Sequence, residues 1–234
     1  MKINVARCLL LLVSFGSGGI VLASAKPCTS ESKTDETCIA NIVDLKPTQF
    51  AVGGLEIEER KAEFEDMEDY VLDQYIKDHE APAVLGPDHR YYLLDRHHLA
   101  RALQEMGKGQ LRLLVTAKWE ELSFTEFWAR MNSNHWVYLY DEKGNGPHRY
   151  EELPQSIMEL KNDPYRSLAW GVRKEGGYEK SDVSFADFAW ANFFRERISV
   201  ELITSDFEKA TEQGVRWAHS REAQNLPGYL GLIR

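Results

Sequence analysis

The chain has 234 residues, of which 43% are apolar and 11% aromatic, and its formal net charge is −9. This composition is ordinary for a globular protein and supports a sizeable core, either as one large domain or as a core domain with a smaller extension. The acidic balance argues against stable binding of duplex DNA, which depends on Lys and Arg side chains neutralising phosphates.

The first segment, residues 1–25, has the order of a secretory signal peptide. Two basic residues, Lys2 and Arg7, precede an apolar run, and cleavage is expected after Ala25. An uncleaved anchor is the alternative, but Gly and Ser interrupt the run, and a membrane span needs ~20 apolar residues. We therefore expect an exported protein, periplasmic or secreted. Cleavage removes two bases and no acid, which takes the formal charge of −9 to −11.

Residues 26–42 are polar and rich in Ser and Thr, which is typical of a tether. Cys28 and Cys38 lie within it, without a CxxC motif or a metal-type cysteine cluster. In an oxidising compartment the two thiols are expected to form a disulfide that closes a small loop, and a pair of free thiols is the alternative.

Residues 43–145 are predicted to form a domain of mixed strands and helices. The evidence is a series of apolar runs separated by turn residues and by two segments with helical periodicity. The predicted elements are a short strand in 42–53 broken by Pro47, an amphipathic helix in the second half of 56–79, a hairpin of strands 84–85 and 91–94 around Gly86-Pro87-Asp88, a helix over 96–106, a strand over 110–119, a helix over 123–132 capped by Ser123 and Glu126, and a strand and turn over 135–146.

Residues 146–234 are predicted to be a helical C-terminal extension. Asp163-Pro164 places a cap and a first-turn proline before one helix, and further caps are expected near Ser184 and Ser205. The many aromatic residues here are expected to form a core rather than a ligand box. Arg166 and Arg173, on the first of these helices, could face a cleft between the two lobes.

The segment LLDRHHLARAL, residues 93–103, groups an acidic, a basic and two histidine side chains at the expected start of a helix. Asp95 is expected to cap the following helix by accepting hydrogen bonds from backbone N–H groups two and three residues on. The free N–H groups and the positive end of the helix dipole also make an anion site. Arg96, His97 and His98 give the first turn a positive charge that opposes the dipole, and a bound phosphate would neutralise it.

Two other interpretations of this cluster stay open. A metal site is one, although adjacent histidines on a helix diverge by about 100° and are poorly placed to share one ion. The other is that one imidazole packs beneath the sheet and hydrogen-bonds to backbone while the second is solvated.

Five motifs occur in a specific order: DLKPTQFAVGGLEIEERK, DRHHLARAL, FW with a nearby Met, DPYRSLAW and FADFAWANFFRERI. Together they cover about residues 42–200 and resemble the ParB/sulfiredoxin superfamily, most closely its ParB-like nuclease branch. The resemblance implies an α+β fold, in which a small mixed sheet with helices is followed by a C-terminal helical lobe. It also implies that the helix after the hairpin holds a phosphate group.

The resemblance further implies which residues form the site. The sequence departs from the related D-G-H-H-R box at Arg96, which replaces glycine, and at Leu99, which replaces arginine, so triphosphate binding is in doubt unless Arg96 or Arg101 compensates. The expected catalytic residues are Glu56, His97 and His98; the expected phosphate contacts are Asp95, Arg96, His97, His98, Arg101 and either Arg60 or Lys61; and Glu56, Glu58 and Asp95 are the candidate ligands of a divalent cation, Mg²⁺ or Mn²⁺.

Three functions follow from this resemblance. The first is a nuclease or phosphoester hydrolase acting on short nucleic acid or a small phosphate ester, which export favours because ATP is scarce outside the cytoplasm. The second is a nucleotide-dependent kinase of the free-serine-kinase type. The third is a non-catalytic module that binds a phosphate ligand or a partner, with the helical tail covering the site or forming a homodimer.

Overall fold

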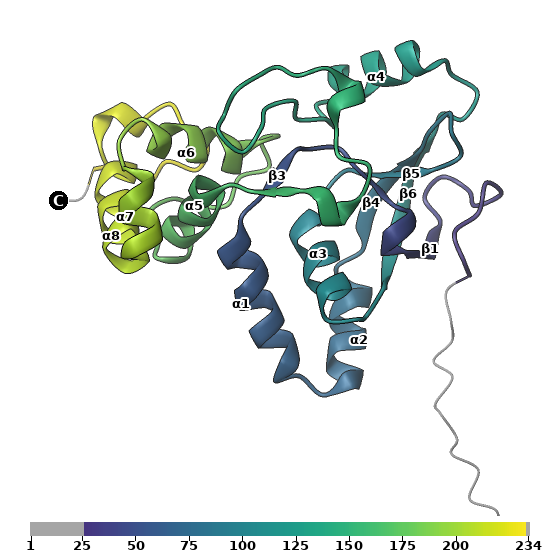
Figure 1. The fold of residues 1–234 in the computed structure, drawn as a ribbon, viewed down its shortest axis with the longest axis horizontal. Coiled ribbons are helices and arrows are strands. Elements are labelled where there is room, and N and C mark those ends of the chain that lie inside the picture. The colour runs from purple at the N-terminus through teal and green to yellow at the C-terminus, as the bar shows by residue number, and fades with distance from the viewer. Residues whose placement is uncertain (1–25, 233–234) are drawn as a thin grey trace, which may run out of the picture.

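The structure is a computed structural model that describes residues 26–232, so the predicted signal peptide, residues 1–25, lies outside the described residues. A mixed sheet with helices is followed by a lobe of helices, which confirms the predicted α+β class (Figure 1). The strands are β1 (Thr37–Asn41), β2 (Lys46–Pro47), β3 (Ala51–Val52), β4 (Ala81–Leu85), β5 (Tyr91–Leu93), β6 (Gln110–Lys118) and β7 (Lys161–Asn162). The helices are α1 (Gly54–Glu65), α2 (Asp69–Asp78), α3 (His97–Glu105), α4 (Phe124–Ser133), α5 (Pro164–Lys174), α6 (Ala186–Arg195), α7 (Val200–Ser205) and α8 (Phe207–Ala218).

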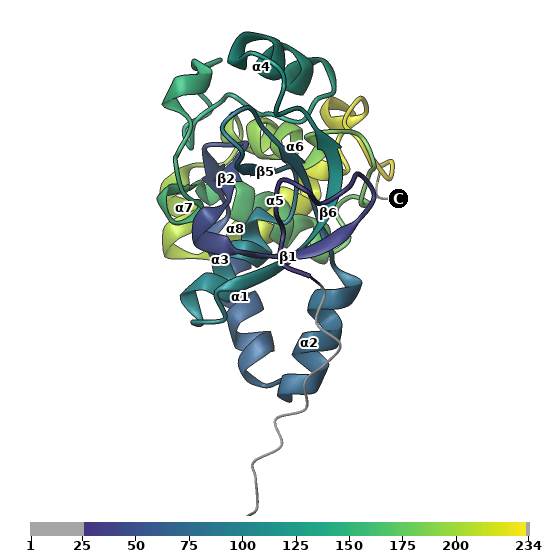
Figure 2. The ribbon, with the colours of Figure 1, turned by 90° about the vertical axis from the view of Figure 1, so that its right-hand side faces the viewer.

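The larger sheet has the strand order β1-β6-β4-β5-β2, and β3 and β7 form a separate pair. The predicted hairpin is confirmed, because β4 pairs antiparallel with β5, while β6 lies parallel to β4 on its other side. Successive side chains of a strand point to opposite faces. Accordingly Leu85 and Leu93 pack in the core with α1, α2 and α3, whereas Val84 and Tyr92 pack with Phe127 of α4. Figure 2 shows α4 on one side of the sheet and α1 and α2 on the other.

The second half of the predicted tether is a strand of the sheet, so the tether interpretation of 26–42 is wrong there. β1 pairs antiparallel with β6, with Cys38 opposite Leu113. Cys38 and Ala40 are buried, whereas Thr37 and Ile39, which alternate with them, are partly exposed, as is typical of an edge strand. Pairing with β6, far away in the sequence, stabilises this strand, and the polar residues around it give no indication of a strand.

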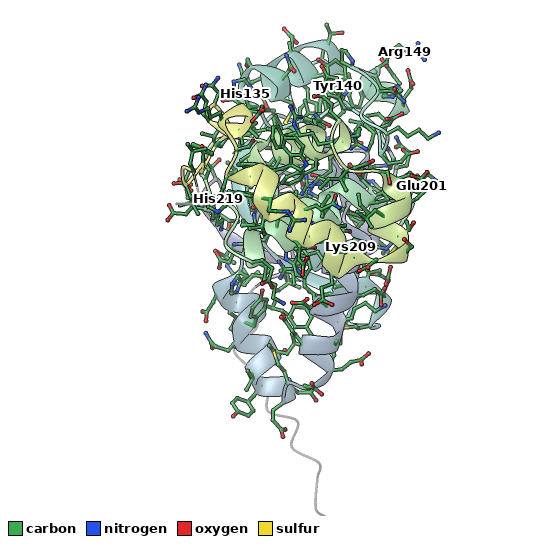
Figure 3. The ribbon with its side chains drawn as sticks, turned by 90° about the vertical axis from the view of Figure 1, so that its left-hand side faces the viewer. His135, Tyr140, Arg149, Glu201, Lys209 and His219 are labelled. Carbon is green, nitrogen blue, oxygen red and sulfur yellow. A yellow bond between two sulfur atoms is a disulfide. The ribbon has the colours of Figure 1, made fainter. Side chains whose placement is uncertain are left out.

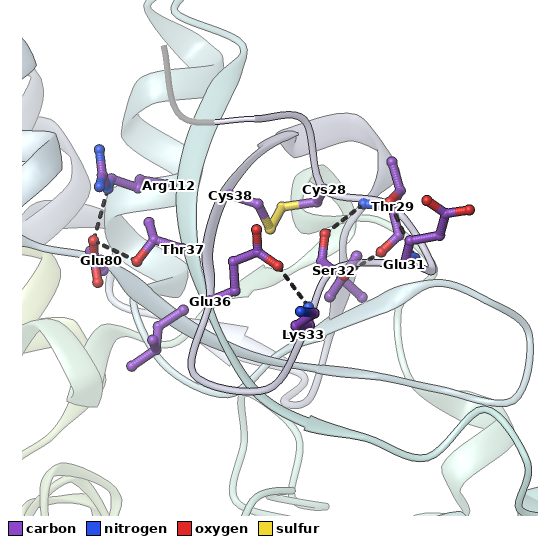
Figure 4. Close-up of a disulfide and its surroundings, with 12 residues drawn as sticks. Cys28, Thr29, Glu31, Ser32, Lys33, Glu36, Thr37, Cys38, Glu80 and Arg112 are labelled. Carbon is purple, nitrogen blue, oxygen red and sulfur yellow. Dashed lines mark hydrogen bonds and ion pairs between the residues drawn. A yellow bond between two sulfur atoms is a disulfide. The ribbon is translucent and has the colours of Figure 1, made fainter. Parts of the chain in front are cut away.

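The predicted disulfide between Cys28 and Cys38 is present, with the Cα atoms 4.9 Å apart. Figure 4 shows the bond beside the start of β1, where Glu80 accepts hydrogen bonds from Thr37 Oγ1 at 3.0 Å and Arg112 Nε at 2.8 Å. The disulfide joins the N-terminal loop to β1, and Glu80, immediately before β4, joins β1 to β6.

Several helix boundaries differ from the predicted ones. The charged segment contains two helices, and α1 begins already at Gly54, because Ile57 and Phe64 bury its sparse apolar face. The predicted strand over 135–146 is reduced to an isolated bridge between Gln49 and Tyr138. In the C-terminal lobe α6 follows Phe185, and α8 is capped by an aspartate one residue after the predicted serine. The caps at Asp163 and at Ser123 with Glu126 are confirmed.

The C-terminal lobe has its own core, in which α5 packs against α6 and α8. Trp190, Phe194 and Leu168 are fully buried there. By contrast Ile157 and Leu160 belong to the core of the sheet, and β7 pairs with β3. Figure 3 looks onto the outer face of the lobe, where the exposed Lys209 and Glu201 lie on α8 and α7. Within residues 26–232, no helix combines the length and the apolar character required to cross a membrane.

Candidate functional site

A cleft of about 600 Å³ lies between the sheet domain and the C-terminal lobe. The start of α1, the turn before α3, the inner side of α5 and the loop before α6 contribute its lining. Positive side chains outnumber negative ones in the lining, although the chain as a whole carries a net charge of −9. The charged and histidine residues that line it are Glu56, Arg60, Asp95, Arg96, His98, His135, Arg166, Arg173, Lys180, Asp182 and Asp187.

His97 is buried and is not among the residues that line the cleft. Its Nε2 accepts a hydrogen bond from the backbone N–H of Thr48 at 3.3 Å, and its ring also hydrogen-bonds to the backbone of Leu93. Burial lowers the pKa of His97 to about 3, so the ring is neutral at physiological pH. The structure therefore uses His97 to join β5 to the segment after β2 and does not bring it to the cleft, where a catalytic or phosphate-binding role was expected.

His98 does line the cleft, and its Nε2 accepts a hydrogen bond from the backbone N–H of Gly53 at 2.8 Å. Burial lowers the pKa of His98 to about 4, so this ring is also neutral and carries its proton on Nδ1. Its Nε2 lies 3.5 Å from Glu56 Oε2, but a nitrogen that accepts a bond from Gly53 has no proton to share with a carboxylate.

Gly53 itself lies directly against α5. A Cβ atom at this position would be 2.8 Å from the backbone nitrogen of Ser167 and 3.1 Å from the carbonyl carbon of Arg166. Only a residue without a side chain permits this approach, which sets α1 and α5 in main-chain contact.

Glu56, in the first turn of α1, is the buried carboxylate of the cleft. Its Oε1 accepts two hydrogen bonds from Arg60, at 3.2 Å from Nε and 2.8 Å from Nη2. Burial opposes ionisation, but the charge and hydrogen bonds of Arg60, together with the charge of Arg166, hold the pKa of Glu56 below its ordinary value. The carboxylate is therefore ionised at neutral pH, with Oε2 not engaged by Arg60.

Arg166 is the side chain that most clearly indicates a ligand. It is only 7% exposed, and its Nε and Nη1 have no hydrogen-bond partner among the described residues. Its guanidinium lies 3.8 Å from the centroid of the Phe188 ring. An unpaired buried charge is costly, and an anion in the cleft would remove that cost. Arg173, on the same helix, donates to both carboxylate oxygens of Asp187, at 2.7 and 2.9 Å.

The N-terminus of α3 is built differently from the prediction. The predicted cap at Asp95 is wrong, because α3 begins at His97 and Arg96 is its N-cap, with φ 67° in the left-handed region. Asp95 Oδ1 instead accepts from the N–H of Arg96, at 2.6 Å. This conformation accounts for the glycine found at the position of Arg96 in related boxes. No side chain caps the helix, so its first N–H groups remain available beside the cleft.

The remaining expected residues lie elsewhere. Arg101 pairs with Glu105 and donates to the carbonyl oxygens of residues 157, 158 and 160, because its face of α3 turns away from the cleft. Lys61 pairs with Glu58 and Glu105, and neither Lys61 nor Glu58 lines the cleft.

The acidic residues do not form a preformed cation site. In the described part of the chain, no group of three His, Cys, Asp or Glu side chains is placed to hold a metal ion. Glu58 points to solvent with 63% of its side chain exposed, and only Glu56 and Asp95 of the three candidate ligands line the cleft. A divalent cation stays a prediction, and the candidate ligands that this chain brings to the cleft are the carboxylates of Glu56 and Asp95.

Comparisons with known proteins agree with the sequence motifs. Residues 38–196 match a family model described as "Putative ParB-like nuclease". A solved structure, protein Atu1540 from Agrobacterium tumefaciens, is 35% identical and superposes with a TM-score of 0.77, covering 85% of this chain and 100% of the other. No curated protein matches the chain. The family match extends over more than half of the sequence, and the chain therefore belongs to the family of ParB-like nucleases.

Proposed function

We propose that the cleft binds the phosphate group of an ester and that the protein hydrolyses that ester, as a phosphoesterase acting on short nucleic acid or a small phosphorylated molecule. The observation that carries this proposal is Arg166, a buried cation that lines the cleft with two nitrogens unpartnered among the described residues. Arginine is well suited to this role because its planar fork matches phosphate oxygens. Membership of the nuclease family supports the same class of substrate.

The groups around the cleft suit charge stabilisation. A phosphate between Arg166 and the N-terminus of α3 would accept hydrogen bonds from the guanidinium and from free backbone N–H groups. The same donors would stabilise the charge that develops on the phosphoryl oxygens during transfer. Arg173 and Asp187 line the cleft as an ion pair whose charges largely cancel, so Arg166 is the cation that a phosphate would meet.

Glu56 is the proposed base. Its Oε2 would take a proton from a water molecule as the water oxygen forms a bond to phosphorus and the ester P–O bond breaks. The departing oxygen would then take a proton from the Glu56 carboxyl group or from solvent water. The low pKa of Glu56 keeps it ionised but also makes it a weak base, so the proposed activity is slow. His98 acts as a positioning residue in this scheme, because it holds the backbone at Gly53, immediately before α1.

One observation favours a second candidate, a non-catalytic module that binds a phosphate ligand. Both imidazoles of the box are neutral and are hydrogen-bonded to backbone, so neither is poised as an acid or base at its Nε2. Binding alone would still use Arg166.

We also propose that the protein is exported, to the periplasm or the medium. The disulfide between Cys28 and Cys38 supports this location, because such bonds persist in oxidising compartments.

The test measures binding and turnover separately on the purified protein. Inorganic phosphate should raise the melting temperature, and this rise should disappear in Arg166→Gln. Hydrolysis of a dinucleotide and of p-nitrophenyl phosphate, assayed with Mg²⁺, Mn²⁺ or EDTA, should fall at least a hundredfold in Glu56→Gln while phosphate binding is retained. Arg101→Gln is the matched control, because Arg101 does not line the cleft, and it should leave both readouts unchanged.

The outcomes separate the candidate functions. Phosphate binding without turnover of either ester would establish the binding module. Consumption of ATP with a small alcohol as acceptor would favour the kinase. An unchanged response to phosphate in Arg166→Gln would refute the proposed site.

A further inference from the structure

A stack of flat groups reaches the lining of the cleft. The guanidinium carbon of Arg130 lies 5.1 Å from the centroid of the Trp119 ring, and Trp119 stacks on Trp136 with 5.2 Å between centroids and 17° between planes. Trp119 is fixed by a backbone hydrogen bond to Leu85 at the end of β4. Trp136 is half-buried and lines the cleft, so the last ring of an ordered stack borders the proposed phosphate site.

A chain of contacts relates Trp136 to the buried arginine. Tyr138, two residues after Trp136, stacks on Phe188 with ring centroids 3.7 Å apart, and Arg166 lies 3.8 Å from the same Phe188 ring. Two residues of chain span at most about 7 Å. The cleft volume of about 600 Å³ is within the usual range for small-molecule sites. Since Trp136 and Arg166 line the same cleft, a ligand that fills it can place a phosphate at Arg166 and a ring against Trp136.

We propose that Trp136 is a stacking platform for an aromatic ring of the ligand, so that the cleft selects aromatic phosphate esters, of which nucleotides are the common biological case, over sugar phosphates. This inference rests on the proposed phosphate site. The chemistry is general, because any base presents a π face and stacking on a side chain is tolerant of base identity. Trp119 stacks on Trp136 and so holds the ring in one orientation, and Trp136 is among the residues that line the cleft.

The ability to discriminate between ligands distinguishes a stacking role of Trp136 from a purely structural role. If Trp136 only packs against the core that contains Val137, its loss lowers stability equally in the presence of any ligand. A stacking platform instead changes the ratio of two affinities, those for adenosine 5′-monophosphate and ribose 5-phosphate, which differ by the base.

The experiment measures both dissociation constants by calorimetry on the full chain. The wild type should bind adenosine 5′-monophosphate about tenfold more tightly than ribose 5-phosphate, a ratio in the range that base stacking supplies. Trp136→Leu, which keeps an apolar side chain without a π face, should reduce the ratio to about one and leave the dissociation constant for ribose 5-phosphate unchanged. Trp136→Phe should retain part of the ratio, and Trp170→Ala, a tryptophan that does not line the cleft, should retain all of it.

Failure of this inference and failure of the phosphate site give different results. A tenfold ratio that persists in Trp136→Leu and Trp136→Phe overturns the platform while the phosphate site stands. Arg166→Gln should weaken both phosphorylated ligands by the same factor. Free adenosine, which lacks phosphate, should still quench tryptophan fluorescence in the wild type but not in Trp136→Leu. If adenosine shows this quenching while Arg166→Gln does not weaken either phosphorylated ligand, the stacking platform stands and the phosphate site fails. No binding of any of the three probes to the wild type overturns both.

Discussion

Because the imidazoles of His97 and His98 are buried, we expect the protein to lose much of its stability in mild acid. His97 and His98 have an ordinary pKa of 6.5 when the chain is unfolded, but burial lowers the pKa values to about 3 and about 4 in the folded protein. Below pH 6.5 the unfolded chain therefore binds protons that the folded protein does not. Its stability must fall as the pH decreases, and the decline ends only below the folded pKa values.

The size of the effect at pH 5 depends mainly on the unfolded pKa. Each histidine is expected to lower the free energy of unfolding by about 2 kcal/mol between pH 8 and pH 5, and the two together by about 4 kcal/mol. This window lies above the range in which most carboxylates titrate. Urea denaturation followed by tryptophan fluorescence, with the disulfide intact, measures the difference directly.

Substitutions test whether the imidazoles of His97 and His98 cause this loss of stability. His97→Gln should be less stable at pH 8, because Thr48 and Leu93 lose their ring partner, yet its change between pH 8 and pH 5 should be smaller by about 2 kcal/mol. His89→Gln, in an exposed turn, is the matched control and should keep the full change. A wild-type change below about 1 kcal/mol, or an unaltered change in His97→Gln, would refute the assignment of neutral buried rings.

Three further perturbations test other parts of the structure. Arg166→Met should leave the ligand-free protein equally stable or about 1 kcal/mol more stable in urea titration, because it removes a buried unpaired charge; a marked loss would contradict the view that the charge serves a ligand. Replacing Cys28 and Cys38 by Ser should lower the free energy of unfolding by about 3 kcal/mol, measured from the denaturant midpoint, and a change within error would mean that the loop is held by other contacts. Gly53→Ala should lower stability by about 1–3 kcal/mol and weaken phosphate binding, read by calorimetry, because a Cβ meets the backbone of α5; normal behaviour would show that α5 can shift.

Much of the fold could be predicted because its signals are local. The hairpin carries apolar strands on either side of Gly86-Pro87-Asp88, and Asp163-Pro164 specifies a helix start by its own geometry. β1 was missed because it is short and follows a polar segment, and because its existence depends on pairing with β6, more than sixty residues away. The start of α1 was missed because a Glu-rich segment hides the two positions, Ile57 and Phe64, that pack against the core.

The site was predicted only in part, for similar reasons. The sequence points to the box, and the structure does bring Glu56, Asp95, Arg96 and His98 to one cleft. Which of two adjacent histidines faces the cleft depends on the left-handed turn at Arg96, and a non-glycine residue there conceals it. The expectation that Arg166 and Arg173 face a cleft between the lobes is confirmed, and one local feature of the sequence indicates that Arg166 matters more than its neighbours.

That feature is the position of Arg166 in its helix. It lies within a run of buried residues in α5, next to Tyr165 and ahead of Leu168, where a charged side chain is out of place unless it has a partner. The identity of the aromatic neighbours could not be read in this way, because Trp136 and Phe188 come from separate segments that meet only in the folded chain.

The main-chain contact at Gly53 has a consequence for how such a protein can diversify. Because α1 and α5 meet without an intervening side chain, the spacing between the carboxylate on one helix and the guanidinium on the other is set by the backbone. If the proposed phosphoesterase activity holds, substitutions in the loops that line the cleft should change which molecules bind while the distance between Glu56 and Arg166 stays fixed.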